Sequence, residues 1–185
     1  SGKIEGARDF DGINDYIKLN GLSYNDGIDL SGGFTLSQWV YINEDVARLV
    51  EQSGIIQIGV DTTSSNNKIE FYISGVTADW HRFENKLNKG EWNYIVVKYD
   101  TTKTYIYING EVNSVSNNGL INYNGKEDYS FSMGRRNDVG DVYFDGKIDE
   151  VGIWNRSLTS TEITELYNSG AGSRPSNATT TTTTF

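Results

Sequence analysis

The stretch EWNYIVVKYDTTKTYIYING, residues 91–110, decides the fold class. Isoleucine alternates with tyrosine over residues 104–109, and a period of two places apolar and polar side chains on opposite faces of a β-strand. The stretch ends in Asn109-Gly110, two residues that both tolerate positive φ and therefore predict a tight hairpin turn. Residues 91–110 thus predict antiparallel strands that bury one face in a core.

Similar segments recur along the chain, separated by Gly, Asn and Asp at the spacing typical of β-sandwiches and barrels. We predict strands over Tyr16–Leu19, Phe34–Ile42, Ile55–Val60, Lys68–Ser74, Trp92–Tyr99, Thr104–Asn109, Ser130–Gly134 and Tyr143–Trp154. The turn at Gly110 predicts one more strand, which carries Val112 and Val115. Since Ile148 and Val151 cannot face the same way on a regular strand, we also predict a β-bulge between them.

The C-terminal part of the chain predicts one helix and a linker. Thr159 and Glu162 have the spacing of a capping box, and Gly170 supplies a stop signal. Beyond Gly172 the chain has no apolar periodicity and ends in a threonine run, a composition typical of a linker. We therefore predict a β-sandwich domain over residues 1–172 and a Thr-rich linker or stalk over residues 173–185.

Composition excludes several classes of function. The 185 residues hold 16 Lys and Arg against 25 Asp and Glu, a net charge of −9, with one His and no Cys. Nucleic-acid binding requires clustered positive charge, so we expect no nucleic-acid partner. The usual zinc ligand sets and a thiol nucleophile are also excluded. No run of residues has the length of a bilayer-spanning segment, so we expect no direct membrane insertion.

Four ordered blocks of residues resemble a laminin-G-like domain of the concanavalin A-like lectin/glucanase superfamily. They are residues 9–12 with 15–17, 33–40, 91–100 with 107–110, and 144–151 followed by 154–158. The resemblance covers about residues 4 to 170. It implies an all-β fold, a two-sheet antiparallel jelly-roll sandwich with one short C-terminal helix. Because the same sandwich hosts lectins, adhesion modules and hydrolases, the resemblance specifies the fold better than the activity.

The resemblance also implies a structural calcium ion. By position, its ligands would be Asp11, the carbonyl group of Gly33, and Asp149. Calcium prefers mixed carboxylate and carbonyl oxygens, which an acidic chain supplies. The alternative is that Asp11 is a turn residue and that Asp149 accepts backbone hydrogen bonds at the predicted bulge. The loop that carries Asp138 and Asp141 is a second candidate for calcium, or an ordinary surface turn.

Aromatic residues on the polar faces of the predicted strands are candidates for sugar binding. Sugars stack on aromatic rings and hydrogen-bond to amides and carboxylates. Candidate ligand-binding residues are Tyr72, Tyr105, Tyr107 and Asn109 on strands, and Trp80 and Arg82 in the segment between strands. Tyrosine is equally an ordinary strand residue that needs no ligand, and Trp80 has the alternative role of capping the sandwich edge.

No pair of carboxylates has the spacing for glycoside hydrolysis, so we predict no catalytic residues. Glu70 has no acid two residues away, and Lys147 stands where the first acid of a catalytic strand would be. We expect a non-catalytic, calcium-supported module of a larger extracellular or cell-surface protein, which binds a glycan or a cell-surface protein beside neighbouring modules. The alternatives are a structural or protein-interaction spacer without a sugar ligand and, third, a glycoside-active enzyme.

Overall fold

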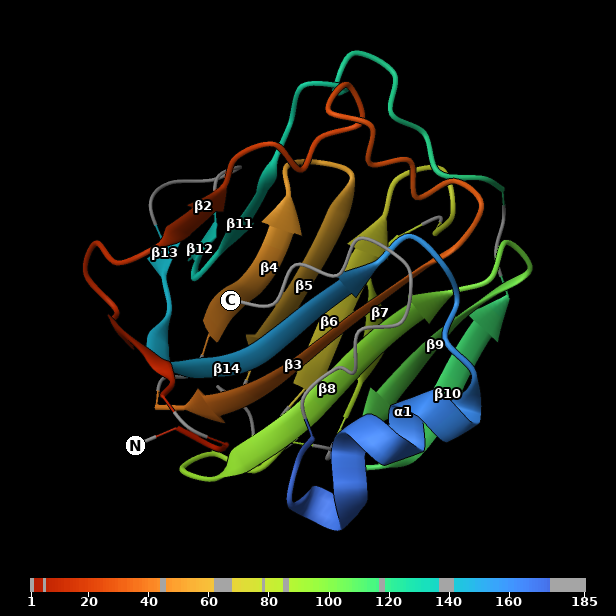
Figure 1. Ribbon diagram of the computed structural model, residues 1–185. Helices are drawn as coiled ribbons and strands as arrows, with labels where there is room; N and C mark the ends of the chain where they lie inside the picture. The colour runs from red at the N-terminus through yellow and green to blue at the C-terminus, as the bar shows by residue number, and fades with distance from the viewer. Residues whose placement is uncertain are drawn as a thin grey trace.

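The protein is a two-layer β-sandwich. The computed structural model describes residues 2–4, 6–43, 46–61, 68–77, 79–84, 87–116, 119–136 and 142–173. The first sheet has the strand order β1-β14-β3-β8-β9-β10, and the second has the order β2-β11-β4-β5-β6-β7. Figure 1 shows the two sheets stacked face to face, with the first sheet in front. The predicted all-β, two-sheet antiparallel sandwich is confirmed.

The strands are short and pair antiparallel throughout the described residues. The first sheet consists of β1 (Arg8–Asp11), β14 (Asp145–Trp154), β3 (Phe34–Ile42), β8 (Trp92–Tyr99), β9 (Lys103–Ile108) and β10 (Glu111–Ser116). The second consists of β2 (Ile17–Leu19), β11 (Phe131–Met133), β4 (Val46–Gln52), β5 (Ile56–Asp61), β6 (Lys68–Ile73) and β7 (His81–Phe83). A small ribbon pairs β12 (Arg135–Arg136) with β13 (Val142–Tyr143).

The core lies between the two sheets. Alternate residues of the strands enter it, as the period of two predicts: Ile106 and Ile108 from β9, and Ile69, Phe71 and Ile73 from β6, are all buried. The hairpin between β9 and β10 turns at Asn109 (φ 51°) and Gly110 (φ 87°) as predicted. These two left-handed residues match the twist of the strands that they join.

The predicted β-bulge in β14 is confirmed. The register against β3 shifts between Asp149 and Gly152, and Glu150 takes a positive φ of 47°. The extra residue lets Ile148 and Val151 both point into the core, where each is buried.

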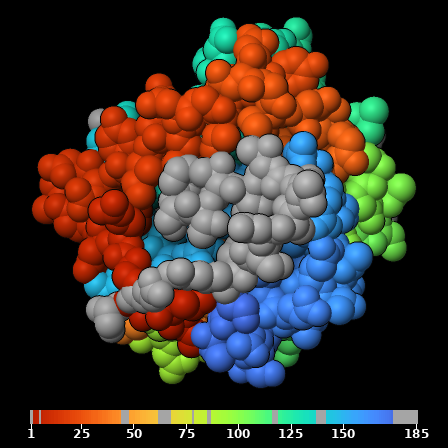
Figure 2. All heavy atoms as spheres, in the orientation of Figure 1, coloured from red at the N-terminus to blue at the C-terminus, as the bar shows by residue number. Residues whose placement is uncertain are grey.

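A helix covers the outer face of the first sheet, the side turned away from the second sheet. The helix α1 (Ser160–Tyr167) begins at the predicted capping box, in which the Glu162 backbone N–H donates to the Thr159 hydroxyl (3.2 Å). It ends before the predicted stop, because Asn168 takes the left-handed conformation (φ 47°) and the short helix η1 (Asn168–Gly170) follows. Figure 2 shows this face of the molecule bordered by the N-terminal segments and by α1.

Three tryptophans contribute to a second apolar cluster on the helix side of the first sheet. Trp39 and Trp154 pack beneath α1 in a second cluster with Leu158, Ile163 and Leu166, outside the core between the sheets. Trp92 is partly buried against the same cluster.

Among the described residues no helix is both long and apolar enough to cross a membrane. Of the predicted linker over residues 173–185, residues 174–185 lie outside the described residues.

Candidate functional site

The outer face of the second sheet, which we call the polar face, carries polar side chains in two rows across the strands. Each residue stands opposite its neighbour in the strand register, so that each row runs along the hydrogen-bonding direction of the sheet. The first row is Lys18, Ser132, Glu51, Gln57 and Tyr72. The second row is Arg48, Gly59, Glu70 and Arg82. The sheet thus gathers charged and aromatic groups from six strands on one face.

Arg48 and Glu51 are two buried charged residues of this face that the sequence did not single out. Arg48 is 3% exposed and Glu51 is fully buried, and their side chains lie 3.8 Å apart (Nε to Oε2). They belong to β4, which escaped prediction because two charged residues interrupt its apolar pattern. The bulge between Arg48 and Val50 turns both charged side chains to the polar face while Leu49 and Val50 enter the core.

The charged residues of the second row, Tyr72 at the end of the first row and Trp80 form the Trp80 cluster, which consists of Arg48, Glu70, Tyr72, Trp80 and Arg82. The Arg48 guanidinium lies 4.4 Å from the centre of the Trp80 ring, and the Tyr72 and Trp80 rings are 5.8 Å apart. Glu70 lies between two cations, 3.8 Å from Arg48 Nη1 and 3.2 Å from Arg82 Nε. The structure therefore brings together three of the six predicted ligand-binding residues.

Contacts inside the Trp80 cluster give its members a structural role. A desolvated cation–π pair is worth roughly 2 kcal/mol, and here it holds Trp80 as a cover over the buried Arg48. The ring contact with Arg48 matches the capping role that was the alternative for Trp80. Arg82 is half exposed and Tyr72 is partly buried, so the rim of the cluster still meets solvent.

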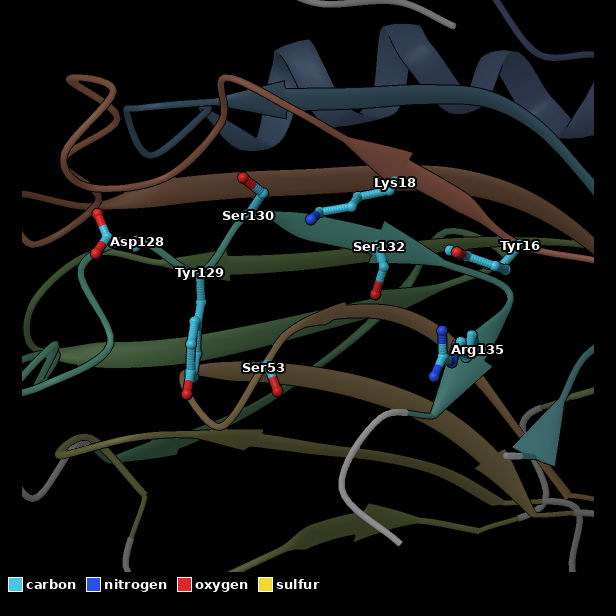
Figure 3. A pocket seen from close by; sticks show the side chains of 8 residues that line it. All are labelled: Tyr16, Lys18, Ser53, Asp128, Tyr129, Ser130, Ser132 and Arg135. Carbon is cyan, nitrogen blue, oxygen red and sulfur yellow. The ribbon is translucent and has the colours of Figure 1, made fainter. Parts of the chain in front are cut away.

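The other end of the first row opens into a pocket of about 310 Å³, which we call the tyrosine pocket. It is lined by Tyr16, Lys18, Ser53, Asp128, Tyr129, Ser130, Ser132 and Arg135. Figure 3 shows Tyr129 at one end and Tyr16 beside Arg135 at the other, with Lys18 extending between them. Tyr16 and Tyr129 are 46% and 47% exposed, which leaves much of both rings available for contact.

Several side chains of the tyrosine pocket are held by neighbours. The Arg135 guanidinium lies 5.0 Å from the Tyr16 ring centre and 5.9 Å from that of Tyr143. Asn25 Nδ2 donates to Asp128 Oδ1 (2.7 Å), and the Ser132 hydroxyl donates to the Glu51 carbonyl (3.4 Å). Tyr16 also lines an adjacent hollow of about 370 Å³ with Arg8, Asp9, Phe10, Asp15 and Ile17. The pocket therefore combines ordered polar groups with two exposed rings.

Strand periodicity could not predict this pocket from the sequence, because most of its residues lie at strand ends and in turns.

Tyr105, Tyr107 and Asn109 lie in the first sheet, so the structure does not place them beside Tyr72. Tyr107 is 7% exposed because it packs in the cluster beneath α1, and Lys98 Nζ lies 4.6 Å from the Tyr105 ring centre. Asn109 Oδ1 accepts from the Tyr94 backbone N–H (2.9 Å). The expectation of one aromatic surface from both strands fails because outward faces of opposed sheets point in opposite directions.

A second pocket, of about 420 Å³, lies between the first sheet and α1. Tyr107 and Asn109 line it together with Tyr94, Gly110, Glu111, Ile163, Thr164, Tyr167 and Ser169. The Tyr94 and Tyr167 rings stack at 5.8 Å, and burial raises the pKa of the Tyr94 hydroxyl. Because Tyr94 and Tyr107 are already buried against the helix, this pocket offers less exposed aromatic surface than the tyrosine pocket.

The three residues expected to share a calcium ion are not brought together. Asp11 stands opposite Asp145 in β14, and Asp149 follows four residues later, roughly 13 Å away at the rise of a strand. Gly33 lies near the far end of β14, since Thr35 pairs with Trp154. Among the described residues no group of three or more His, Cys, Asp or Glu side chains could hold a metal ion. Asp138 and Asp141 lie outside the described residues.

Both aspartates make the backbone contacts of the alternative interpretation. Asp11 Oδ1 accepts from the N–H groups of Ile13 (2.9 Å) and Asn14 (3.3 Å), which lower the pKa of its carboxyl. Asp149 Oδ2 accepts from the N–H groups of Lys3 (2.7 Å) and Ile4 (3.2 Å), and its Oδ1 from that of Glu150. Asp149 therefore ties the N-terminal segment to the bulge of β14.

Comparison with known proteins agrees with this geometry. Residues 11–164 match the family model of laminin-G-like domains described as the concanavalin A-like lectin/glucanases superfamily. The chain belongs to this superfamily. The resemblance seen in the four sequence blocks is thereby confirmed. The search of curated proteins found no match.

Several solved structures share the fold at low sequence identity. A putative carbohydrate-binding protein from Bacteroides ovatus has a TM-score of 0.63 at 20% identity, over 85% of this chain and 45% of that protein. Domain 4 of an extracellular arabinanase from Geobacillus stearothermophilus, in complex with arabinotriose, scores 0.57 at 19% identity, over 91% and 82%. A sialidase module from Ruminococcus gnavus, bound to sialyllactose, scores 0.61 at 10%, over 85% and 95%. The chain spans less than half of the Bacteroides ovatus protein. All three are similar to this chain in fold.

Proposed function

We propose that this superfamily member is a non-catalytic carbohydrate-binding module that holds its glycan in the tyrosine pocket. The observation that carries the proposal is the pair of exposed rings, Tyr16 and Tyr129, at the two ends of a cavity lined by hydroxyl groups and charges. Aromatic faces bind the apolar faces of sugars, while hydroxyl and charged groups orient them. Two structural neighbours are described as bound to an oligosaccharide, which supports the same ligand class.

The arrangement of carboxylates favours binding over hydrolysis. A glycosidase places its scissile bond between two carboxyl groups, about 5 Å apart when it retains the sugar's configuration. On the polar face, Glu51 and Glu70 both lie 3.8 Å from Arg48, so a guanidinium group occupies the space between them. Incubating the protein with polysaccharides and assaying for new reducing ends tests whether it lacks hydrolase activity. Turnover that disappears in Glu51→Gln or Glu70→Gln would contradict it.

We further propose that the module works at the cell surface or outside the cell, beside other modules of a longer protein. The acidic charge and the threonine run of residues 179–184 support this setting.

We also propose that the loop that carries Asp138 and Asp141 binds calcium. If calcium supports the fold, the melting temperature rises on adding CaCl₂ and falls again with a chelator. Unchanged melting in both conditions would remove calcium from the proposal.

Ring removal tests the binding site directly. Each of Tyr16→Ala and Tyr129→Ala should weaken binding to a glycan found on an array by roughly 2- to 12-fold, since one aromatic contact is worth about 0.5 to 1.5 kcal/mol. Isothermal titration or surface plasmon resonance measures the change in Kd. Tyr24→Ala is a matched control, because Tyr24 is similarly exposed at 40% but does not line the pocket; its ring contacts that of Tyr123 at 4.7 Å.

Equal losses in Tyr24→Ala and in the pocket variants would place the glycan elsewhere. Absence of binding to every spot of a broad glycan array would favour the alternative of a spacer domain that recognises a protein. Both outcomes can be interpreted only if the variants are folded. Circular dichroism spectra and melting curves therefore accompany each titration.

A further inference from the structure

The tyrosine pocket has a charge opposite to that of the chain. The whole chain carries a net charge of −9, yet the pocket is lined by two cations, Lys18 and Arg135, and one acid, Asp128. At physiological ionic strength exposed charges are largely screened beyond about 8 Å, so the groups that line the pocket contribute most directly to its local potential. The buried carboxylate of Glu51, which stands opposite Ser132, is paired with Arg48. The local potential therefore favours an anion on a molecule that is otherwise acidic.

The acid of the pocket already has a protein partner. Asp128 Oδ1 accepts the side-chain amide hydrogen of Asn25 at 2.7 Å. Asp128 stands with Tyr129 at one end of the pocket, away from Arg135 at the other (Figure 3). A ligand group near Lys18 and Arg135 is consequently separated from the one negative charge of the lining.

Lys18 is placed to meet a ligand. It is exposed on β2, opposite Ser132 of β11, and its side chain extends along the pocket in Figure 3. Within the described residues its ammonium group makes no ion pair or hydrogen bond with the protein. Two other lysines are engaged: Lys147 pairs with Asp9, and Lys126 Nζ donates to the Gly54 carbonyl at 2.6 Å. The Lys18 ammonium group thus remains available to bind an anion.

Arg135 supplies an ordered second charge. Its guanidinium lies over the Tyr16 ring and near that of Tyr143, at 5.0 and 5.9 Å, and these ring contacts limit its rotation. A planar guanidinium matches the geometry of carboxylate and sulfate groups, and an ordered one loses less conformational entropy on binding. The same contact places the charge beside the exposed Tyr16 ring, where a sugar would stack.

We propose that the tyrosine pocket selects an anionic sugar, one that carries a carboxylate or a sulfate group, and that Lys18 binds this group with Arg135 beside it. The inference rests on the proposed function, because Tyr16 and Tyr129 hold the sugar ring itself. The cavity of about 310 Å³ lies at the low end of the roughly 300–1,000 Å³ range of ligand pockets. It suits a terminal or single charged sugar unit rather than a long chain segment.

A glycan array with paired probes tests the selection. It presents neutral oligosaccharides beside the same oligosaccharides carrying a uronic acid, a sialic acid or a sulfate group, and titrations follow for the bound pairs. We expect the full 185-residue chain to bind the charged member roughly tenfold more tightly, about 1.4 kcal/mol. The carboxylate and sulfate probes show which of the two groups is preferred. The preference should shrink between 50 and 500 mM salt, because Lys18 and Arg135 act through screened charge.

Charge reversal identifies the residue. Lys18→Glu should remove the preference, with about a tenfold loss for the charged probe and little change for its neutral partner. Lys103→Glu is the matched control: it changes the net charge equally but lies exposed in β9 of the other sheet. We expect it to bind as the wild type does. Melting curves establish that both variants are folded.

Three results would overturn the inference. Equal affinity of wild-type protein for charged and neutral partners would refute anion selection while leaving glycan binding intact. Equal losses in Lys18→Glu and Lys103→Glu would show an effect of net charge rather than of the pocket. Failure to bind any probe of the array, charged or neutral, would refute the proposed function together with this inference.

Discussion

At the scale of single residues, the most unusual feature is the buried cation Arg48. It is 3% exposed and lies within 3.8 Å of two carboxylates, Glu51 and Glu70, with Trp80 above it. A buried ion pair costs desolvation energy that its attraction only partly offsets, but removing one partner takes part of the compensating charge away from the buried group that remains. Arg48 therefore organises the polar face by holding two acids and one aromatic ring in position.

Replacing Arg48 should destabilise the protein much more than replacing its neighbour Arg82. We expect Arg48→Ala to lower the free energy of unfolding by about 3 to 5 kcal/mol, because Glu51 is fully buried and loses a cation. Arg82→Ala is the matched control, since Arg82 contacts the same Glu70 but is half exposed, and should cost less than about 1 kcal/mol. Urea unfolding at neutral pH measures both. Similar losses in the two variants would contradict the role given to Arg48.

At the scale of elements, the helix α1 depends on charge at its first turn. Arg156 donates to both carboxylate oxygens of Glu162, at 3.0 and 2.6 Å, and the Thr159 backbone N–H donates to Oε2 at 2.8 Å. These contacts lower the pKa of Glu162 from its ordinary value of 4.5 to about 2. The helix in turn buries Ile163 and Leu166 over Trp39 and Trp154.

The stabilisation by ionised Glu162 should disappear in acid. A carboxyl group whose pKa is lower in the folded state stabilises the protein fully above its unfolded pKa, and less as pH falls towards the folded value. Glu162→Gln should therefore be less stable than the wild type by up to about 1 kcal/mol at pH 7, since the pair is one-third exposed. The difference should shrink between pH 4.5 and about 2. Urea unfolding at several pH values measures it. A difference for Glu162→Gln that stays constant over this pH range would contradict the assignment.

At the scale of the whole molecule, one core joins both sheets. Its buried residues come from strands of either sheet, including Phe34 and Ile106 of the first and Ile58 and Phe71 of the second. Each sheet buries its apolar face only against the other sheet. Separating the two sheets would therefore expose the whole core to solvent. The helix cluster shares β3, β8 and β14 with this core and depends on them.

The sandwich should consequently unfold in a single transition. In urea, tryptophan fluorescence and far-ultraviolet circular dichroism should give the same midpoint, as two-state unfolding requires. The variant Trp80→Phe removes the tryptophan of the polar face and leaves three reporters on the helix side, Trp39 and Trp154 in the cluster beneath α1 and Trp92 against it. Its fluorescence midpoint should still coincide with that of its circular dichroism. An earlier fluorescence transition in this variant would mean that the helix side melts separately.

The sequence alone determined the class of fold and much of its local structure. Alternation along residues 68–74 and 104–109 identified strands and their buried faces, Asn109-Gly110 identified the hairpin, and the capping box identified the start of α1. The spacing of Ile148 and Val151 identified the bulge. These signals are local, because the period of a strand and the φ angles of a turn depend on residues within a few positions of each other.

The tertiary structure alone decided which polar residues meet. It separated Tyr72 from Tyr105 and Tyr107 by placing their strands in different sheets, and it spread Asp11, Gly33 and Asp149 along β14. It also brought Lys18 and Tyr129, 111 positions apart, into one pocket, and Arg48 beneath Trp80. Strand order sets such pairings, and strand order results from packing the whole core. The periodicity of each strand specifies which face is polar but carries no information on which other strands share that face.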